Sequence, residues 1–314
     1  MLAGSVFLLG CGQPQTDQSQ RAQKISPPTG AIASNETAHI SVMDGIGRQV
    51  SLRAPARRIV SLSPGFTETL FEIGCGNQVI LRDKWSVVPS EARKLPVTDS
   101  VNPSIEAIGG YNPDLVVLYF NDARHVRALA KIGVEAAVFD PKTFEEVATT
   151  IETLGVLCGR RDNARAVARD MRSQKKKIEQ MAKRVSPIRV YVEIDGTDRS
   201  RPWTAGAGSF VDELLRSAGA ENVFAYLKKP YAQVNIEEVI AQNPEAILLA
   251  GTESERISDV SYILQRPGFS AVEAVREERI INTIDKNILS RPSARLADGL
   301  AQLFNALHPV EGAP

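Results

Sequence analysis

Two stretches of the chain share the same order of polar and apolar positions. Ile105 to Tyr119 and Ile236 to Ala250 each begin with Ile-Glu, continue as a short amphipathic segment, and pass through Asn-Pro and an acidic residue into an apolar run. Proline ends a helix because it lacks an amide hydrogen and restricts the residue before it. An apolar run without polar alternation is typical of a parallel strand covered on both faces. Each stretch is therefore predicted to form a helix followed by a buried strand.

A second pair of stretches matches in the same order. Gly65 to Val79 and Ser209 to Val223 each run from an acidic helix start through an apolar face to a glycine that ends the helix. Strand patterns precede them at Arg58 to Leu62 and at Arg189 to Ile194. Two matching pairs predict two lobes of similar α/β build. The alternative is that a common β/α pattern occurs twice by chance.

A long helix is predicted between these lobes. Residues 161–185 contain no proline or glycine and are rich in strong helix formers. Asp162 or Asn163 is a candidate cap for its start, and Ser186-Pro187 ends it. At 1.5 Å per residue, a helix of about 25 residues is nearly 40 Å long, enough to run along a whole lobe. Its lysine run at 175–177 is interpreted as a solvated face.

The first residues have the pattern of an export signal. Residues 1–12 form a short apolar segment that contains Leu-Leu-Gly-Cys, which resembles the lipobox of bacterial lipoproteins and makes Cys11 the expected site of lipidation. No lysine or arginine precedes the apolar run, and the alternative is a buried N-terminal strand. The segment that follows is rich in Gln, Ser, Thr and Pro, which predicts a flexible tether. The predicted organisation is a signal segment (1–11), a tether (12–38), an N-terminal α/β lobe (39–160), an interlobe helix (161–186), a C-terminal α/β lobe (187–308) and a tail (309–314).

Composition narrows the class of protein. The chain has 314 residues, 43% of them hydrophobic, with 37 basic and 37 acidic side chains and no formal net charge. These values are those of a globular protein, and the length fits two folded units. A nucleic-acid-binding protein needs an excess of basic groups to neutralise phosphates, so balanced charge argues against one. Cys75 and Cys158 can form a disulfide in an oxidising compartment or remain two buried thiols. No CxxC motif is present and the three histidines are scattered, which argues against zinc.

Several motifs together resemble one family. The carrying residues are Met43-Asp44-Gly45, Gly47-Arg48, Arg58 to Pro64, Thr67-Glu68, Asn112 to Val116, Trp203 to Gly206, Gln233-Val234 with Glu237, and Asn243-Pro244. In order and spacing they resemble the periplasmic substrate-binding proteins of ABC importers for cobalamin and iron complexes, over about residues 40–307. The resemblance implies an α/β fold of two Rossmann-like lobes joined by a single long α-helix, which is the class III periplasmic-binding-protein fold, with the ligand in the cleft between the lobes.

The resemblance also implies a ligand site. Matching the cobalamin-binding members position by position gives the cleft aromatics Trp85, Tyr119, Trp203 and Tyr231, and the cleft arginine Arg291. Aromatic rings provide broad rigid contact for a macrocycle, and a guanidinium binds carbonyl or carboxylate edges. The sequence departs from those members near Ser100, where they carry a tryptophan, and near Asn287, where they carry an acidic residue. The alternative for each aromatic is ordinary core packing.

Partners follow from the same resemblance. Glu106 and Glu237 occupy the same position in the two lobes and match the residues that dock on arginines of the membrane permease. The alternative is that both are helix N-terminal carboxylates favoured by the macrodipole. The expected function is that of the extracytoplasmic solute-binding component of an ABC importer, a lipid-anchored monomer that delivers a corrinoid ligand to a permease and its ATPase.

A ferric siderophore or haem is the alternative ligand, and a two-lobed metal-site enzyme or a sensor is the alternative class. No nucleic-acid partner and no resident metal are expected, for the reasons of charge and ligand spacing given above. No resident cofactor or enzymatic activity is expected either, because no P-loop, HExxH or GxSxG motif is present.

Overall fold

The computed structural model describes residues 39–120, 123–251 and 260–309. The first sheet is a parallel one with the strand order β5-β4-β3-β6-β7. Its strands are β3 (Ile59–Leu62), β4 (Val79–Asp83), β5 (Val97–Thr98), β6 (Leu115–Tyr119) and β7 (Glu135–Phe139). The helices of this lobe are α1 (Pro64–Glu72), α2 (Ile105–Gly110), α3 (Ala123–Lys131) and α4 (Phe144–Leu157), and an antiparallel pair, β1 (Ile40–Met43) and β2 (Gln49–Leu52), precedes the sheet.

The second sheet is mixed and has the order β11-β9-β8-β12-β13, with β10 also paired to β8. Its strands are β8 (Ile188–Asp195), β9 (Trp203–Ala205), β10 (Ala220–Asn222), β11 (Tyr231–Gln233), β12 (Ala246–Leu249) and β13 (Ile280–Ile281). Strands β8, β10, β12 and β13 run parallel, whereas β9 is antiparallel to both β8 and β11. The helices are α6 (Phe210–Ser217), α7 (Ile236–Gln242), α8 (Val260–Leu264), α9 (Glu273–Arg276), α10 (Lys286–Ser290) and α11 (Leu296–Leu307).

The repeat predicted from the sequence is present in the structure. Helix α2 leads into β6 and α7 leads into β12, and each of these strands is parallel to the first long strand of its sheet. Every residue from Leu115 to Leu118 and from Ala246 to Leu249 is buried, as a strand covered on both faces requires. The predicted fold class, two α/β lobes joined by a long helix, is confirmed. The bounds of the six segments drawn from the sequence remain predictions.

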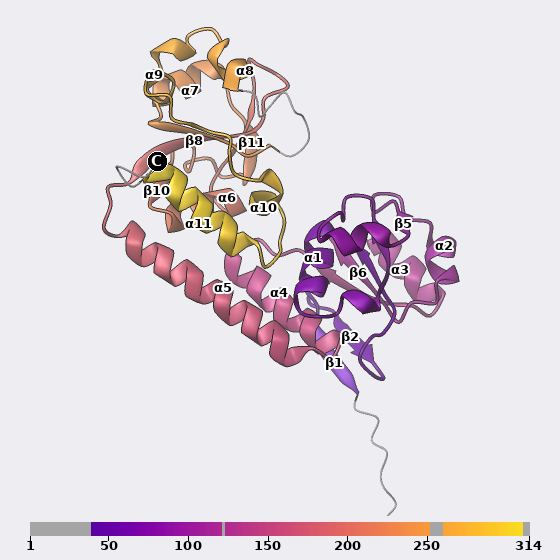
Figure 1. The fold of residues 1–314 in the computed structure, drawn as a ribbon. Coiled ribbons are helices and arrows are strands. Elements are labelled where there is room, and N and C mark those ends of the chain that lie inside the picture. Colours follow the sequence, from indigo (N-terminus) through magenta and orange to yellow (C-terminus); the bar gives the residue numbers. More distant parts are fainter. Residues whose placement is uncertain (1–38, 121–122, 252–259, 310–314) are drawn as a thin grey trace, which may run out of the picture. The chain divides into compact units, whose positions relative to one another are not determined.

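The connecting helix is α5 (Arg161–Ala182), which packs against α4 of the first lobe and against α11 and α6 of the second (Figure 1). It ends three residues earlier than the pattern predicts. Its start also differs from the prediction, because neither Asp162 nor Asn163 caps it. The N-cap is Arg160, which makes no side-chain capping bond, and Asn163 Nδ2 instead donates to the carbonyl of Ile73 at 3.2 Å.

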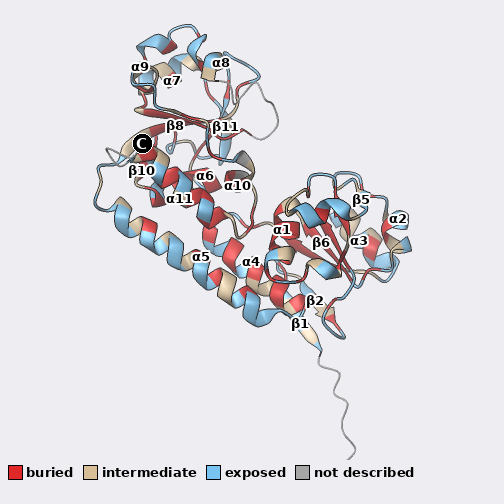
Figure 2. Ribbon diagram, in the orientation of Figure 1, coloured by how far each residue is buried: buried red, intermediate tan, exposed pale blue. Residues whose placement is uncertain are grey.

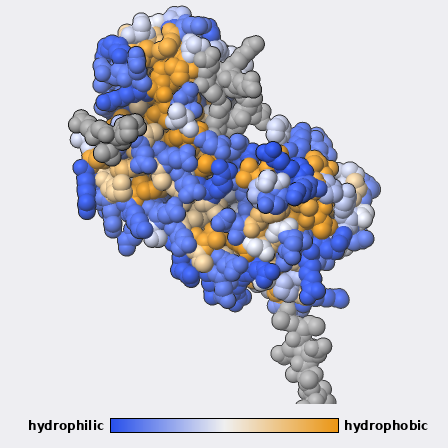
Figure 3. All heavy atoms as spheres, viewed as in Figure 1, coloured by the Kyte–Doolittle hydropathy of each residue, from blue (hydrophilic) through white to orange (hydrophobic). Residues whose placement is uncertain are grey.

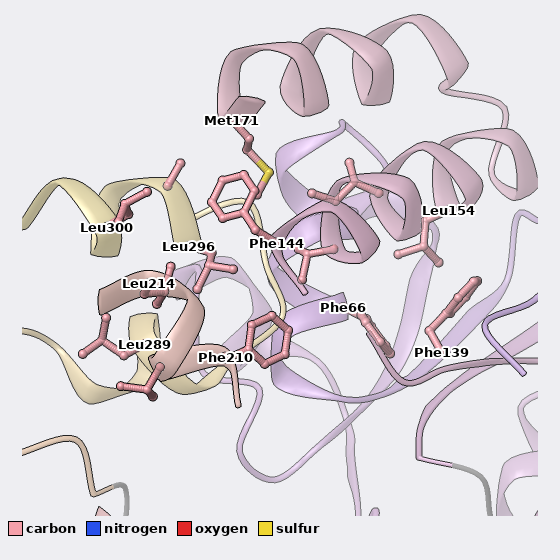
Figure 4. Packing of buried hydrophobic residues seen from close by; sticks show 14 of the residues in the cluster. Phe66, Phe139, Phe144, Leu154, Met171, Phe210, Leu214, Leu289, Leu296 and Leu300 are labelled. Carbon is pink, nitrogen blue, oxygen red and sulfur yellow. The ribbon is translucent and has the colours of Figure 1, made fainter. Parts of the chain in front are cut away.

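One apolar cluster runs through both lobes. Phe66 and Phe139 contribute from the first lobe, and Leu214 and Leu300 contribute from the second, while Met171 of α5 lies between them (Figure 4). Figure 2 shows the same arrangement as buried faces on α4 and α11 and an outer face of α5 that is largely exposed. Hydrophilic side chains cover most of the molecular face drawn in Figure 3, with hydrophobic groups between them. The connecting helix is therefore part of the core and holds both lobes.

A disulfide fixes the base of this connection. Cys75, just after α1, is bonded to Cys158, the C-cap of α4, with their Cα atoms 6.6 Å apart. The sequence left open whether these cysteines pair or stay free, and the structure pairs them. Because α4 is followed almost directly by α5, the bond ties the start of the connecting helix to the first lobe.

Replacing both Cys75 and Cys158 with Ala should lower the free energy of unfolding by about 2–4 kcal/mol, since the bond closes a long loop and restricts the unfolded chain. The sequence separation is 83 residues. Guanidinium titrations with and without reductant measure this loss, and reduced wild-type protein is the control, because it should unfold near the midpoint of the variant. Equal midpoints for oxidised wild type and variant would show that the bond does not form in solution.

Candidate functional site

A cavity of about 1040 Å³ lies between the two lobes. This volume is just above the range usual for small-molecule sites, roughly 300–1,000 Å³. Its lining is rich in aromatic rings and also contains three basic side chains. The lining residues are Pro64, Trp85, Tyr119, Phe120, Pro141, Lys142, Gly208, Ser209, Phe210, Lys229, Pro230, Tyr231, Asn287 and Arg291. The sequence predicted Trp85, Tyr119, Tyr231 and Arg291 as ligand-binding residues, and the structure brings these four together.

The first lobe contributes the segments that follow its parallel strands. Tyr119 is the last residue of β6, and Pro141 and Lys142 come just after β7. In open α/β sheets ligands bind beyond the carboxyl ends of the strands, where these residues lie. The Tyr119 ring packs edge-on against buried Phe66 at 5.8 Å, and Phe120 lies over Tyr119 with ring centroids 3.9 Å apart. Core packing therefore fixes the aromatic wall on this side.

Trp85 is held by a buried carboxylate. Its backbone amide donates to Asp83 Oδ1 at 2.7 Å, and the Ser86 hydroxyl donates to the other carboxylate oxygen. Asp83 is inaccessible to solvent, whereas 49% of the surface of Trp85 is exposed. Burial raises the pKa of Asp83, while Ser86, the Trp85 amide and the Arg291 charge act against that shift. The turn thus anchors its own backbone and presents the indole to the cavity.

The second lobe contributes two segments in close contact. Gly206 donates its amide to the carbonyl of Pro230 at 2.9 Å, and a Cβ at Gly206 would lie 2.3 Å from the carbonyl oxygen of Lys229. Glycine is therefore required there for the backbones to approach. This contact places Phe210, the first residue of α6, and Tyr231, the first residue of β11, in the same wall.

Both cavity tyrosines remain neutral. Burial raises the pKa of Tyr119 well above its usual value, and the nearby Asp140 and Tyr231 raise it further. Desolvation also raises the pKa of Tyr231, although 44% of that residue's surface is exposed. Both phenols therefore keep their protons at physiological pH and can donate hydrogen bonds to a ligand.

Arg291 is already bonded to the opposite lobe. Its Nη1 donates to Glu68 Oε1 of α1 at 3.0 Å. Lys142, another basic residue of the lining, pairs with Asp140 of its own lobe and lies 5.6 Å from the centroid of the Phe120 ring. The sequence predicted Arg291 as a cleft residue but not this ion pair, because the two partners are 223 positions apart in the chain.

Trp203 does not lie in the lining of the cavity. It is the first residue of β9 and pairs with Gln233 of β11, whereas Tyr231 pairs with Ala205. Residues that face each other across antiparallel strands, and residues two apart on one strand, share a face of the sheet. Trp203 is therefore on the same face as Tyr231, two residues farther along, with 42% of its surface exposed. It is absent from the lining of the cavity that contains the other four predicted ligand residues.

Comparisons with known proteins agree with this architecture. The family described as periplasmic binding protein matches residues 59–286. That match covers most of the folded body. This chain belongs to the periplasmic binding protein family.

One relative compared by sequence and two solved structures illustrate the similarity of this binding protein to known ones. It is 25% identical to YvrC of Bacillus subtilis, an uncharacterized ABC transporter substrate-binding lipoprotein, over 98% of this chain and 95% of YvrC. The crystal structure of the periplasmic vitamin B12 binding protein BtuF of Vibrio cholerae is similar with a TM-score of 0.69 and 26% identity, over 81% of this chain and 97% of that one. The periplasmic heme-binding protein RhuT from Roseiflexus is similar with a TM-score of 0.72 and 25% identity, over 81% and 98%.

Glu106 and Glu237 are equivalent in the two lobes of the binding protein. Each is the second residue of its helix, α2 or α7, and each is exposed. The Ser104 hydroxyl accepts the amide of Ala107 at the start of α2, and Asn235 with Glu238 forms a capping box at the start of α7. Other groups cap both helices, so these two carboxylates remain at the surface.

Some lining residues were not predicted from the sequence. Phe120 has a left-handed backbone, with φ at 65°, and 56% of its surface is exposed. Its position directly after Tyr119 at a strand end was an available signal. Phe210 resembled an ordinary core residue of an amphipathic helix, and only the loop contact at Gly206 brings it to the cavity.

Other expectations concern metals, membranes and the N-terminus. Among the described residues, no group of three or more His, Cys, Asp or Glu side chains is arranged to hold a metal ion. In the same part of the chain, no helix is long and apolar enough to cross a membrane. Cys11, the signal segment and the tether lie outside the described residues.

Replacing Asp83 with Asn should make the binding protein relatively more stable as pH rises. The folded-state pKa of Asp83 is raised, so its contribution to stability is fully present below its unfolded value, near 3.8, and falls as the buried group ionises. The difference in unfolding free energy, variant minus wild type, should therefore increase between about pH 4 and 7. Urea titrations across that range measure it, and a difference independent of pH would contradict the assignment.

Proposed function

We propose that this protein is the solute-binding component of an ABC importer that captures a corrinoid ligand between its lobes. The observation that supports this most directly is the interlobe cavity with aromatic rings on both walls. Flat, rigid side chains of this kind suit a large macrocycle, because they give broad contact at low entropic cost. Vitamin B12-binding relatives and a B12-binding structural neighbour are consistent with that ligand.

The charges in the cavity favour a corrinoid over haem. A corrinoid has neutral amides at its periphery, whereas haem has two carboxylates. Of the three basic residues in the lining, Arg291 and Lys142 both have carboxylate partners, Glu68 and Asp140, which reduces the positive charge that these two offer to a dianion. Their remaining N–H groups can still donate to carbonyl oxygens. Haem remains the principal alternative because of the haem-binding neighbour, and a ferric siderophore is the next.

The transport role requires further partners. Glu106 and Glu237 are proposed to dock on arginines of a permease that works with an ATPase, since paired charges of this kind guide association and register. The protein is proposed to act as a monomer, anchored outside the cytoplasm through a lipid on Cys11 after removal of the signal segment. The lipoprotein name of YvrC supports the anchor.

Cyanocobalamin should quench the tryptophan fluorescence of the protein and bind more tightly than haemin or a ferric hydroxamate. Replacing Tyr231 with Ala should weaken its binding about tenfold, the equivalent of about 1.4 kcal/mol of lost contact. Tyr226→Ala is the matched control, because Tyr226 is an exposed tyrosine of the same lobe outside the cavity lining.

Calorimetry with the same variants provides the decisive comparison. Equal effects of Tyr231→Ala and Tyr226→Ala would reject the cavity as the ligand site, and tighter haemin binding would replace the corrinoid with haem. Trp203→Ala tests that residue separately. A loss of affinity would place the ligand across the β9–β11 face, and unchanged affinity would remove Trp203 from the site.

Replacing both Glu106 and Glu237 with Ala should leave corrinoid affinity unchanged and lower uptake severalfold in cells that carry the permease. The reason is that both carboxylates are exposed and outside the cavity lining. The double variant Glu72→Ala and Glu277→Ala removes the same charge from other exposed positions and is the control. A fall in ligand affinity, or equal uptake by the two double variants, would contradict the docking role.

A further inference from the structure

A buried carboxylate from the first lobe holds the arginine of the cavity. Glu68 lies within α1 and has only 6% of its surface exposed. Its Oε1 accepts from Arg291 Nη1 at 3.0 Å, and its Oε2 accepts from the Ser293 hydroxyl at 3.2 Å. Arg295 Nη1 is 3.6 Å from the same Oε2. These two donors and the ion-pair partner Arg295 belong to the segment that connects α10 and α11, so Glu68 joins the two lobes beside the cavity.

Helix α1 cannot shift along the segment between α10 and α11 without disrupting close packing. A Cβ at Gly65 would lie 2.8 Å from the carbonyl oxygen of Pro292, so the start of α1 is packed against the backbone of that segment. Arg295 Nη2 is also held by Asp285 Oδ2 at 3.2 Å. Removing one partner of a buried ion pair leaves the other charge uncompensated. Glu68 therefore fixes both the position and the electrostatic state of Arg291.

The cavity lining, in contrast to the buried carboxylate beside it, carries positive charge. Among the described residues that line it, Lys142, Lys229 and Arg291 are basic and none is acidic. Two of these cations are offset from just outside the lining, Lys142 by Asp140 and Arg291 by Glu68. The Lys142–Asp140 pair is the more exposed of the two and is more strongly screened by solvent, whereas the Arg291–Glu68 pair is mostly buried and acts at a lower effective dielectric. Glu68 is therefore the carboxylate that is bonded to Arg291 and offsets its charge at the cavity, beside Asp83, which also interacts electrostatically with Arg291.

We propose that Glu68 is a specificity-determining residue, which cancels the charge of Arg291 and makes the cavity select a neutral macrocycle over its carboxylate analogue. The inference rests on the proposed function, since it concerns the same ligand site. Glu68 bonds the lining residue Arg291 but does not itself line the cavity, so it acts as a positioning residue. A Gln at this position keeps one oxygen acceptor, which can serve Arg291, and its amide NH2 can donate to the Ser293 hydroxyl, while the negative charge is removed.

The test uses two ligands that share one macrocycle. Cyanocobalamin is compared with its monocarboxylic acid, in which one peripheral amide is hydrolysed, by calorimetry on the full chain. Glu68→Gln should raise the affinity for the acid relative to the amide by about tenfold, as expected for a unit charge at roughly 10 Å and an effective dielectric of about 20. Arg291→Gln should shift this ratio the other way, because it removes a cation from the cavity and leaves the Glu68 carboxylate only partly compensated, by Arg295 at 3.6 Å.

The double variant completes the test. Glu68→Gln combined with Arg291→Gln should return the ratio close to that of wild type, because the pair is removed as a unit. Glu72→Gln is the matched control, since Glu72 is an exposed carboxylate one helical turn along α1 and should leave the ratio unchanged. Thermal unfolding of each variant reports lobe packing separately from the ratio.

Each result has one meaning. If the affinity for the acid relative to the amide is the same in Glu68→Gln and Glu72→Gln, the inference is overturned, even where the unfolding temperature falls. The reason is that a purely structural role changes stability and not the preference for ligand charge. If wild type binds haemin in place of cyanocobalamin, the proposed corrinoid ligand is wrong. The charge test is then made with haemin and its dimethyl ester, and an unchanged ratio there overturns the inference as well. If Glu68→Gln does not fold, the double variant compared with Arg291→Gln decides the question, because these two proteins differ only in the charge at Glu68.

Discussion

The packing of α5 against both lobes is the constraint on which the remaining structure depends. Met171 and Ile178 bury one face of this helix in a cluster that includes residues of both sheets. A lobe of this size could be connected by a loose linker, but a helix that belongs to the core on both sides restricts how far the lobes can separate. The Cys75–Cys158 bond and Asn163 tie the same helix to the first lobe. The cavity between the lobes is therefore largely formed before any ligand arrives.

That preformed cavity explains the character of its walls. Exposed aromatic side chains are costly unless they serve a contact, and three of them, Trp85, Phe120 and Tyr231, line the same space. Each is held by local structure: Trp85 by a buried carboxylate, Phe120 by its packing on Tyr119, and Tyr231 by the contact at Gly206. Rigid walls with phenol and guanidinium donors suit a large, flat molecule with polar edges better than a small substrate that must be enclosed.

Sequence reasoning succeeded where the cause is local. The helix-Asn-Pro-strand repeat depends on proline geometry and on continuous burial, which act over a few residues, and it correctly predicted α2 with β6 and α7 with β12. Tyr119 was predicted from the family resemblance, and it lies at the end of β6, a strand that the sequence pattern also predicts. Phe210 and the Glu68–Arg291 pair were missed because their roles depend on contacts between segments that are far apart in the chain. The pattern around Trp203 favoured a cavity residue, yet strand register places it two residues beyond Tyr231.

The sequence by itself determined the fold class, the duplication, the connecting helix and the balanced charge, because periodicity, helix breakers and composition are properties of short stretches. Only the tertiary structure decided which side chains share the cavity, that Cys75 and Cys158 are bonded, and that Arg291 is neutralised from the other lobe. The physical reason is that electrostatic and packing energies depend on distance in space. Two groups separated by more than two hundred residues interact only after the fold has brought them within about 3 Å.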